Sequence, residues 1–249
     1  MDFFRGRTAI VTGAAHGIGR GIAELLEALG SRVVAVDKDH PDLEDAFPDG
    51  RYALRRGNLE TDDVDALAED ICTRDGPIQL LVNNVGIDTP GRFLDLEPDG
   101  FDQVFQTNLR GPWFFTKRVV RHFLDERRGG SVVFVSSLHD HAIRLRPHYS
   151  ASKAAVYMLV KELAHELGPS GIRVNAVSPG VVRSASVPPS GPEDTARTRR
   201  LVPLGRIGEP ADVARIVALL LNDEWAGYVT GANVPVDGGL GLHSWSVDP

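Results

Sequence analysis

The chain has 249 residues, of which 42% are hydrophobic and 24% charged, a composition typical of a folded globular protein with one core. Its net charge of −7 disfavours nucleic acid or an anionic membrane as the main partner, because both attract basic surfaces. No apolar run reaches the roughly 20 residues that span a bilayer, and a single cysteine, Cys72, excludes an internal disulfide. We therefore expect a cytoplasmic protein.

Short β-rich apolar runs alternate with amphipathic helical stretches along the whole chain. The predicted strands are Thr8–Thr12, Arg32–Asp37, Arg51–Leu54, Leu80–Val82, Ser131–Ser136, Arg173–Ser178 and Asn233–Val236. The predicted helices are Ile18–Leu29, Val64–Thr73, Phe101–Arg127, Tyr149–Leu167 and Ala211–Leu221. This alternation predicts a single α/β domain over residues 1–249, with a parallel sheet of about seven strands covered by helices on both faces. Within it, residues 184–205 are expected to form a substrate-loop insertion.

Three glycines of the segment Thr12–Gly19 lie between the first predicted strand and the first predicted helix. A side chain there would block both a tight turn and the close approach of a ligand, and the helix N-terminus offers free N–H groups to a phosphate. The spacing, Gly-x-x-x-Gly-x-Gly, differs from the common dinucleotide fingerprint, so a glycine-rich turn without a ligand is the alternative. The predicted pyrophosphate site comprises Gly13, His16, Gly17, Ile18 and Gly19.

Asp37 ends the second predicted strand, 18 residues after Gly19. A carboxylate in that place can accept hydrogen bonds from the ribose hydroxyls of adenosine and would repel a 2′-phosphate. Asp37 therefore predicts NAD rather than NADP, while the neighbouring Lys38 favours the opposite choice. A capping or turn role is the alternative for Asp37.

Tyr149 and Lys153 are four residues apart on a predicted helix, so they share one face. A phenol with a pKa of about 10 is a poor base, but the Lys153 ammonium and an oxidised nicotinamide would lower that pKa and make Tyr149 a general acid or base. Ser136 or Ser137, at the end of a strand, would hold the substrate oxygen, and Asn108 would anchor a water that relays the proton from Lys153. A packing or capping role is the alternative for each residue alone. Together, after a nucleotide turn, they predict hydride transfer between a dinucleotide and an alcohol or carbonyl.

These motifs resemble the short-chain dehydrogenase/reductase family from Gly6 to about Gly239. The matching segments are Thr12–Gly19, Asn83–Gly86, Asn108, Tyr149–Lys153, Arg173–Gly180, Pro203–Ala214 and Tyr228–Gly239. The resemblance implies a Rossmann-like doubly wound fold, a nicotinamide cofactor, an Asn–Ser–Tyr–Lys tetrad and, usually, a homotetramer. Further cofactor contacts implied at matching positions are Asn58, Leu59, Asn84, Gly86, Pro179, Gly180, Val182 and Ser184, beside Tyr149 and Lys153 themselves.

The chain departs from the family pattern at several positions. The family serine usually lies 13 residues before the tyrosine, which gives Ser136, whereas the second serine at the strand end, Ser137, lies 12 before. We choose Ser137, because strand position fixes geometry while loops tolerate deletions. The usual alanine before Gly86 is a valine, the usual aspartate is Asn58, and a common threonine is Ser184. None of these changes removes a catalytic group.

The segment Leu138–His148, which precedes Tyr149, contains three histidines, an aspartate and two arginines. It resembles the corresponding loop of glucose- and aldose-type dehydrogenases, which predicts a polar polyol, sugar or hydroxy acid substrate held by Ser137, His139 and Tyr149. A solvated or subunit-facing loop is the alternative. Because no further ligands cluster near these histidines, we expect no metal site.

Two other functions compete with this prediction. A 3-oxoacyl thioester reductase would typically use NADPH, which Asp37 and the absence of arginine at position 16 disfavour. A non-catalytic NAD-binding regulator is disfavoured by the intact tetrad. In the C-terminal tail, Leu240–Pro249, Trp245 is expected to be buried at a subunit interface.

Overall fold

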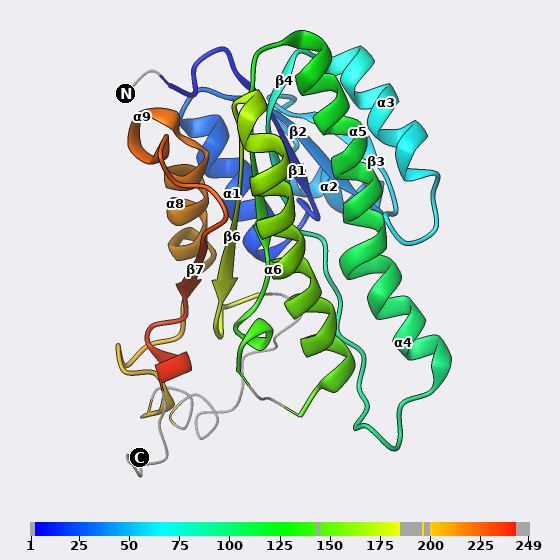
Figure 1. The fold of residues 1–249 in the computed structure, drawn as a ribbon, viewed down its shortest axis with the longest axis vertical. Coiled ribbons are helices and arrows are strands. Elements are labelled where there is room, and N and C mark those ends of the chain that lie inside the picture. Colours follow the sequence, from blue (N-terminus) through cyan, green and yellow to red (C-terminus); the bar gives the residue numbers. More distant parts are fainter. Residues whose placement is uncertain (1–2, 143–144, 185–195, 197–199, 243–249) are drawn as a thin grey trace.

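A computed structural model of the chain describes residues 3–142, 145–184, 196 and 200–242. Its centre is a seven-stranded parallel sheet in the order β3-β2-β1-β4-β5-β6-β7 (Figure 1). The strands are β1 (Thr8–Thr12), β2 (Arg32–Asp37), β3 (Ala53–Arg56), β4 (Ile78–Asn83), β5 (Gly130–Val135), β6 (Ile172–Pro179) and β7 (Asn233–Val236). The order reverses between β1 and β4, and a crevice at the carboxyl ends of strands at such a point is the usual ligand site of open α/β sheets. The predicted doubly wound, Rossmann-like fold is confirmed.

Helices cover both faces of this sheet. They are α1 (Gly17–Ala28), α2 (His40–Ala46), α3 (Val64–Asp75), α4 (Pro98–Phe105), α5 (Gly111–Glu126), α6 (Pro147–Leu167), α8 (Pro210–Leu221) and α9 (Asp223–Ala226). Helices α1 and α8 pack on one face, and α3, α5 and α6 on the other. Among the described residues no helix is long and apolar enough to cross a membrane.

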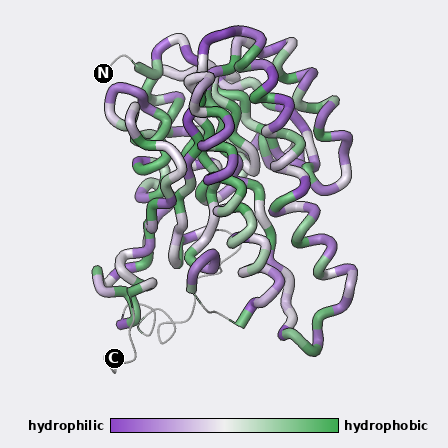
Figure 2. The backbone as a smooth tube through the Cα atoms, in the orientation of Figure 1, coloured by the Kyte–Doolittle hydropathy of each residue, from purple (hydrophilic) through white to green (hydrophobic). Residues whose placement is uncertain are grey.

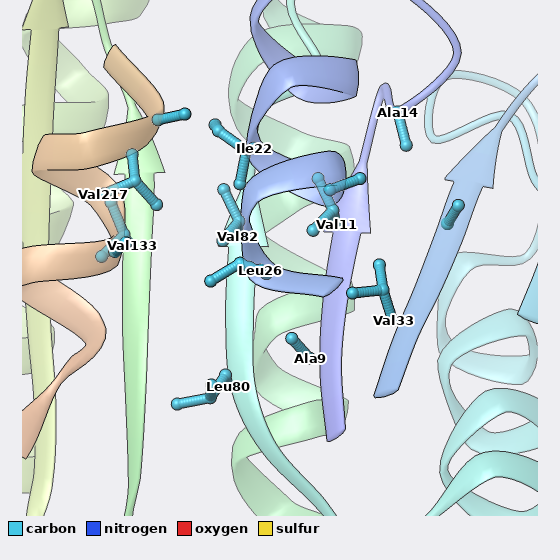
Figure 3. Packing of buried hydrophobic residues seen from close by; sticks show 14 of the residues in the cluster. Ala9, Val11, Ala14, Ile22, Leu26, Val33, Leu80, Val82, Val133 and Val217 are labelled. Carbon is cyan, nitrogen blue, oxygen red and sulfur yellow. The ribbon is translucent and has the colours of Figure 1, made fainter. Parts of the chain in front are cut away.

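Side chains alternate along each strand and pack into two separate hydrophobic cores, one on each face of the sheet. Ala9 and Val11 of β1 pack with Ile22 of α1 and Val217 of α8 (Figure 3), whereas Ile10 packs on the opposite face. Every residue of β1 is buried, as expected for a parallel strand covered on both sides. Each fully buried Val, Leu or Ile contributes about 1.5–3 kcal/mol relative to exposure. The outer helices alternate hydrophilic and hydrophobic stretches along their length (Figure 2), as amphipathic helices do.

The predicted helix Phe101–Arg127 is wrong as a single element. A π-helical turn, Gln106–Arg110, separates α4 from α5 and carries Asn108. The physical reason lies in Pro112, which has no N–H to donate to the carbonyl of Asn108 four residues earlier. π-Turns are frequent at functional sites.

The other predicted strands and helices lie within a few residues of the observed ones, whereas the short helices α2 and α9 were not predicted. Strand β3 begins two residues after the predicted Arg51. Helix α2 was not predicted, because it is short and acidic; the carboxylate of Asp39 caps it by accepting from Asp42 N at 3.5 Å.

Candidate active site

A cleft of about 570 Å3 opens at the carboxyl ends of the central strands. Most of the predicted cofactor contacts line it: Gly13, His16, Gly17, Ile18, Asp37, Asn58, Leu59, Asn84, Gly86, Tyr149, Lys153, Pro179, Gly180 and Ser184. Two predicted contacts do not line it. Val182 is buried in the core beside α8, and Gly19 is buried within the turn. Thr107 and Ile87 line the cleft and were not predicted, although each directly adjoins a predicted residue.

The glycine turn is held in a conformation that only glycine fits well. Gly13 has φ +65°, and a Cβ added to it would lie 2.9 Å from Asn84 Nδ2. A Cβ on Gly19 would lie 2.0 Å from the carbonyl oxygen of Gly13. Gly19 is therefore required by the packing of the turn, although it does not line the cleft. The Asn84 amide fixes the turn by donating to Thr12 O at 3.1 Å and Gly13 O at 3.0 Å. The cradle that a phosphate needs is therefore built into the fold.

Asp37 reaches the same turn from the end of β2. Its Oδ2 accepts from Ala15 N at 3.0 Å and its Oδ1 accepts from Lys38 N at 2.8 Å. These two bonds hold the carboxylate at the rim of the cleft, where the Lys38 side chain also lies. Asn58 is less available than predicted, because its Oδ1 accepts from Glu60 N at 3.0 Å.

Tyr149, which is partly exposed, and the buried Lys153 lie near the start of α6, and Ser137 lies two residues after the end of β5. Ser137 and Tyr149 both line the cleft, and the Ser137 side chain is close enough to lower the pKa of the phenol. Ser137 Oγ also accepts from His139 N at 3.2 Å. Ser136 lines the cleft too, but its hydroxyl donates to the backbone carbonyl of Lys153 at 3.4 Å. Successive residues of an extended chain point to opposite sides, so only one of the two serines can meet Tyr149.

Burial dominates the electrostatics of the phenol. It raises the pKa of Tyr149 above its usual value; the hydrogen bond with Ser137 opposes the rise, and the carboxylates of Asp88 and Asp140 add to it. The sequence predicted that Lys153 lowers the pKa of Tyr149. In the structure that pKa is raised, and Lys153 is not among the groups that shift it. The ammonium lies 5.7 Å from the ring centroid and donates to Val135 O at 3.1 Å.

Lys153 is itself strongly affected by its surroundings. Only 3% of its surface is exposed, and burial lowers the pKa of its ammonium to about 8, against the opposing charge of Asp140. Such a lysine can gain or lose a proton close to neutral pH. It is thereby suited to take part in proton transfer.

Asn108 stands close to this pair across Gly86. A Cβ on Gly86 would lie 3.0 Å from Lys153 Nζ and 3.5 Å from Asn108 Oδ1. The Asn108 amide is engaged elsewhere, since its Oδ1 accepts from Ile87 N at 2.8 Å and its Nδ2 donates to Ser152 Oγ at 3.1 Å. The role of Asn108 as a water anchor stays a prediction. Its backbone carbonyl is a better candidate for binding that water than its side chain, because Pro112, four residues later, has no N–H to donate to it.

The segment before Tyr149 lines a second pocket, of about 690 Å3, to which His139, Asp140, His141 and Arg146 contribute. Several of its polar side chains also contact other parts of the protein. Arg146 and His148 both contact the backbone carbonyl of Thr89, at 3.2 and 3.1 Å, and the Asp140 side chain is fully buried. His139 does adjoin the site: its ring meets the Tyr149 ring edge to face at 5.0 Å between centroids. Arg144, Trp245 and most of the segment Ser184–Arg200 lie outside the described residues.

The two serines differ enough to be separated by mutation. We expect Ser137→Ala to lower kcat by about 10²-fold, because a donor at the reacting oxygen is lost. Ser136→Ala, the matched control, should change kcat less than about threefold, since its hydroxyl bonds only to a backbone carbonyl. Steady-state kinetics on both variants measures this. The reverse ranking would make Ser136 the substrate-binding serine.

Comparison with known proteins agrees with this geometry. A family model described as enoyl-(acyl carrier protein) reductase matches residues 13–241. The chain is 36% identical to L-xylulose reductase of Homo sapiens over 96% of its own length and 98% of the relative's, and 35% identical to 3beta-hydroxysteroid dehydrogenase 1 of Eggerthella lenta over 97% and 96%. Among solved structures, 3-ketoacyl-(acyl-carrier-protein) reductase from Brucella melitensis complexed with NADH superposes with a TM-score of 0.88 at 30% identity, covering 96% of this chain and 99% of that one. The chain therefore belongs to the short-chain dehydrogenase/reductase family, whose members bind a nicotinamide cofactor and act on alcohols or carbonyls.

Proposed function

We propose that the chain is an NAD-dependent oxidoreductase that moves hydride between a secondary alcohol and the nicotinamide. The observation that carries the proposal is that Ser137, Tyr149 and the buried Lys153 line the same cleft as the glycine turn and Asp37. A nicotinamide dinucleotide fits the cleft, because the glycines leave space that a Cβ would fill. When bound, it supplies the acceptor or donor of hydride.

The chain's own residues would handle the proton and the oxygen. In the oxidative direction, Ser137 holds the substrate hydroxyl while Tyr149 Oη accepts its proton. The carbon–hydrogen bond breaks with its electron pair leaving as hydride, and the carbonyl double bond forms. Lys153, whose ammonium is close to its titration point, passes the proton outward. In the reductive direction each transfer reverses.

The preference for NAD rests on Asp37. Its two backbone hydrogen bonds fix a negative charge where a 2′-phosphate would lie, and His16 occupies the position in the turn where an arginine would favour phosphate. Asp37→Ala should raise the NADPH-to-NADH ratio of kcat/KM by about tenfold, the equivalent of about 1.4 kcal/mol. The kcat/KM of parent and variant with each cofactor gives the ratio. A parental enzyme that prefers NADPH would refute the assignment.

The substrate class proposed is a small polyol, sugar or hydroxy acid. Similarity to an L-xylulose reductase supports it, and His139 beside Tyr149 offers a polar contact. The second candidate, a 3-oxoacyl thioester reductase, is supported by similarity to the Brucella 3-ketoacyl-(acyl-carrier-protein) reductase. Purified protein should be tested with NAD or NADH on polyols, ketoses, hydroxy acids, hydroxysteroids and acetoacetyl thioesters, following the absorbance of reduced nicotinamide. The highest kcat/KM on a thioester would favour the second candidate.

We also propose the homotetramer that the family resemblance implies. A groove of about 340 Å3 between α5 and α6 carries exposed apolar side chains, including Trp113, which is 46% exposed. Such a surface is typical of an association site. Sedimentation equilibrium gives the subunit number.

A further inference from the structure

The carboxylate of Asp140 is buried behind the active site. Its side chain is 0% exposed, and it lies in the short 3-10 helix Leu138–Asp140 that begins directly after Ser137. Burying an ionised carboxylate is costly unless hydrogen bonds and a partner compensate for lost hydration.

Two side chains from distant parts of the chain, and one from the neighbouring residue, surround the two oxygens of Asp140. Oδ2 accepts from Ser178 Oγ of β6 and, at 2.8 Å, from Asn233 Nδ2 of β7. Oδ1 contacts Nδ1 of His141. We call Asp140, Ser178 and Asn233 the clamp, because they tie the turn after β5 to the ends of the next two strands. The backbone N–H of Asp140 also donates to Ser137 O at 2.9 Å, so the clamp acts on the serine that meets Tyr149.

The charged and titratable groups around Asp140 are few. His141 is its ion-pair partner among the described residues, and His139 lies on the same turn. Ser178 and Asn233, on the strands packed against it, are neutral. Helix α6 packs against the turn that carries Asp140, and the Asp140 charge acts on Tyr149 and Lys153 of that helix. Arg146 lines the same pocket as Asp140. No arginine or other lysine of the described chain forms an ion pair with Asp140, so the negative charge stays available to Lys153.

We propose that Asp140 is a positioning residue of the proposed hydride transfer: it holds the Ser137 turn through the clamp and supplies the negative charge that Lys153 faces. The inference rests on the proposed function for its kinetic consequences. The effect of the Asp140 charge on the phenol does not depend on the proposed function, because it can be measured by titrating Tyr149 without turnover. The two parts of the role can be separated by substitution.

Asp140→Asn removes the charge and keeps the shape. The amide oxygen can still accept from Ser178 and Asn233, and the amide nitrogen can donate to His141 once that imidazole changes tautomer. Because the Asp140 charge raises the pKa of both Lys153 and Tyr149, its loss lowers both. The pH dependence of kcat/KM reports the essential acid and base of the free enzyme. Any limb of that profile that follows Tyr149 or Lys153 should therefore move to lower pH in Asp140→Asn.

Asp88→Asn is the matched control for charge. The charge of Asp88 raises the pKa of Tyr149 and is not among the causes for Lys153, so this variant should move only a limb that follows Tyr149. Ser178→Ala is the control for the clamp, since it keeps the charge and removes one donor. It should lower kcat/KM by about tenfold through misplacement of Ser137 while both limbs stay in place. A parental kcat/KM in Ser178→Ala would refute the role of the clamp in positioning Ser137.

A second readout does not depend on catalysis. Ultraviolet difference titration of Tyr149→Phe against its parent isolates the Tyr149 phenolate, and the same difference is then taken in an Asp140→Asn background. The midpoint should fall to lower pH when Asp140 is neutralised. An unchanged midpoint together with an unchanged pH profile would overturn the charge role. If no alcohol or ketone is turned over, the proposed function fails, yet the phenol titration still decides on Asp140. Should Asp140→Asn not fold, Asp140→Ser replaces it in both measurements.

Discussion

Replacing Tyr149 by phenylalanine is expected to lower kcat by about 10²–10⁴-fold, the range that a positioned general acid or base contributes. The phenylalanine keeps the aromatic ring, including its edge contact with His139, and loses only the hydroxyl that meets Ser137. Binding of NADH should therefore change less than about threefold. Steady-state kinetics and a fluorescence titration of NADH measure the two effects separately.

Tyr157→Phe is the matched control for this substitution. Tyr157 lies two turns further along α6, where its ring packs against Lys161 at 4.2 Å, and it does not line the cleft. It should keep the parental kcat. A Tyr149→Phe enzyme with parental turnover on its best alcohol would remove the proposed mechanism, whatever the substrate.

The sheet and the nucleotide turn were predictable because their signals are local. Alternating apolar runs and helical periods mark β1, α1 and β2 in sequence, and the glycine spacing between them marks the turn. The observed β1, β2 and β7 have the predicted boundaries. Asp37 followed from the same logic, because the end of the second strand must meet the turn after the first in a parallel sheet.

The surroundings of the catalytic pair were not predictable, because they depend on contacts between distant residues. Asp140 meets Ser178 and Asn233 across 38 and 93 residues. In the sequence it looked like one of several polar groups directed at substrate, and only the fold places it behind the active site. The rise in the Tyr149 pKa has the same origin, since burial is a property of the packed helix and not of the Tyr-x-x-x-Lys spacing.

The choice between Ser136 and Ser137 depends on both residue spacing in the sequence and strand position in the structure. Counting residues from the family pattern favoured Ser136, whereas strand position favoured Ser137. The structure places Ser137 against the phenol, because the backbone alternates after β5 and the loop that follows is one residue shorter. Geometry at a strand end is thus a better guide than spacing across a loop.

Gly19→Ala is expected to weaken NADH binding by about a hundredfold, the equivalent of about 2.7 kcal/mol, and to lower the free energy of unfolding by about 1–3 kcal/mol. The added Cβ would lie 2.0 Å from Gly13 O and 2.8 Å from Gly13 C, which are backbone atoms that cannot rotate away. The start of α1 must then move off the turn, and its N–H groups leave the phosphate position. Gly168→Ala is the matched control, because a Cβ there meets nothing within 4 Å and φ is −53°. Calorimetric titration with NADH and thermal unfolding of both variants measure the two effects. Parental NADH affinity in Gly19→Ala would mean that the pyrophosphate does not lie on this turn, and the proposed cofactor site would have to be abandoned.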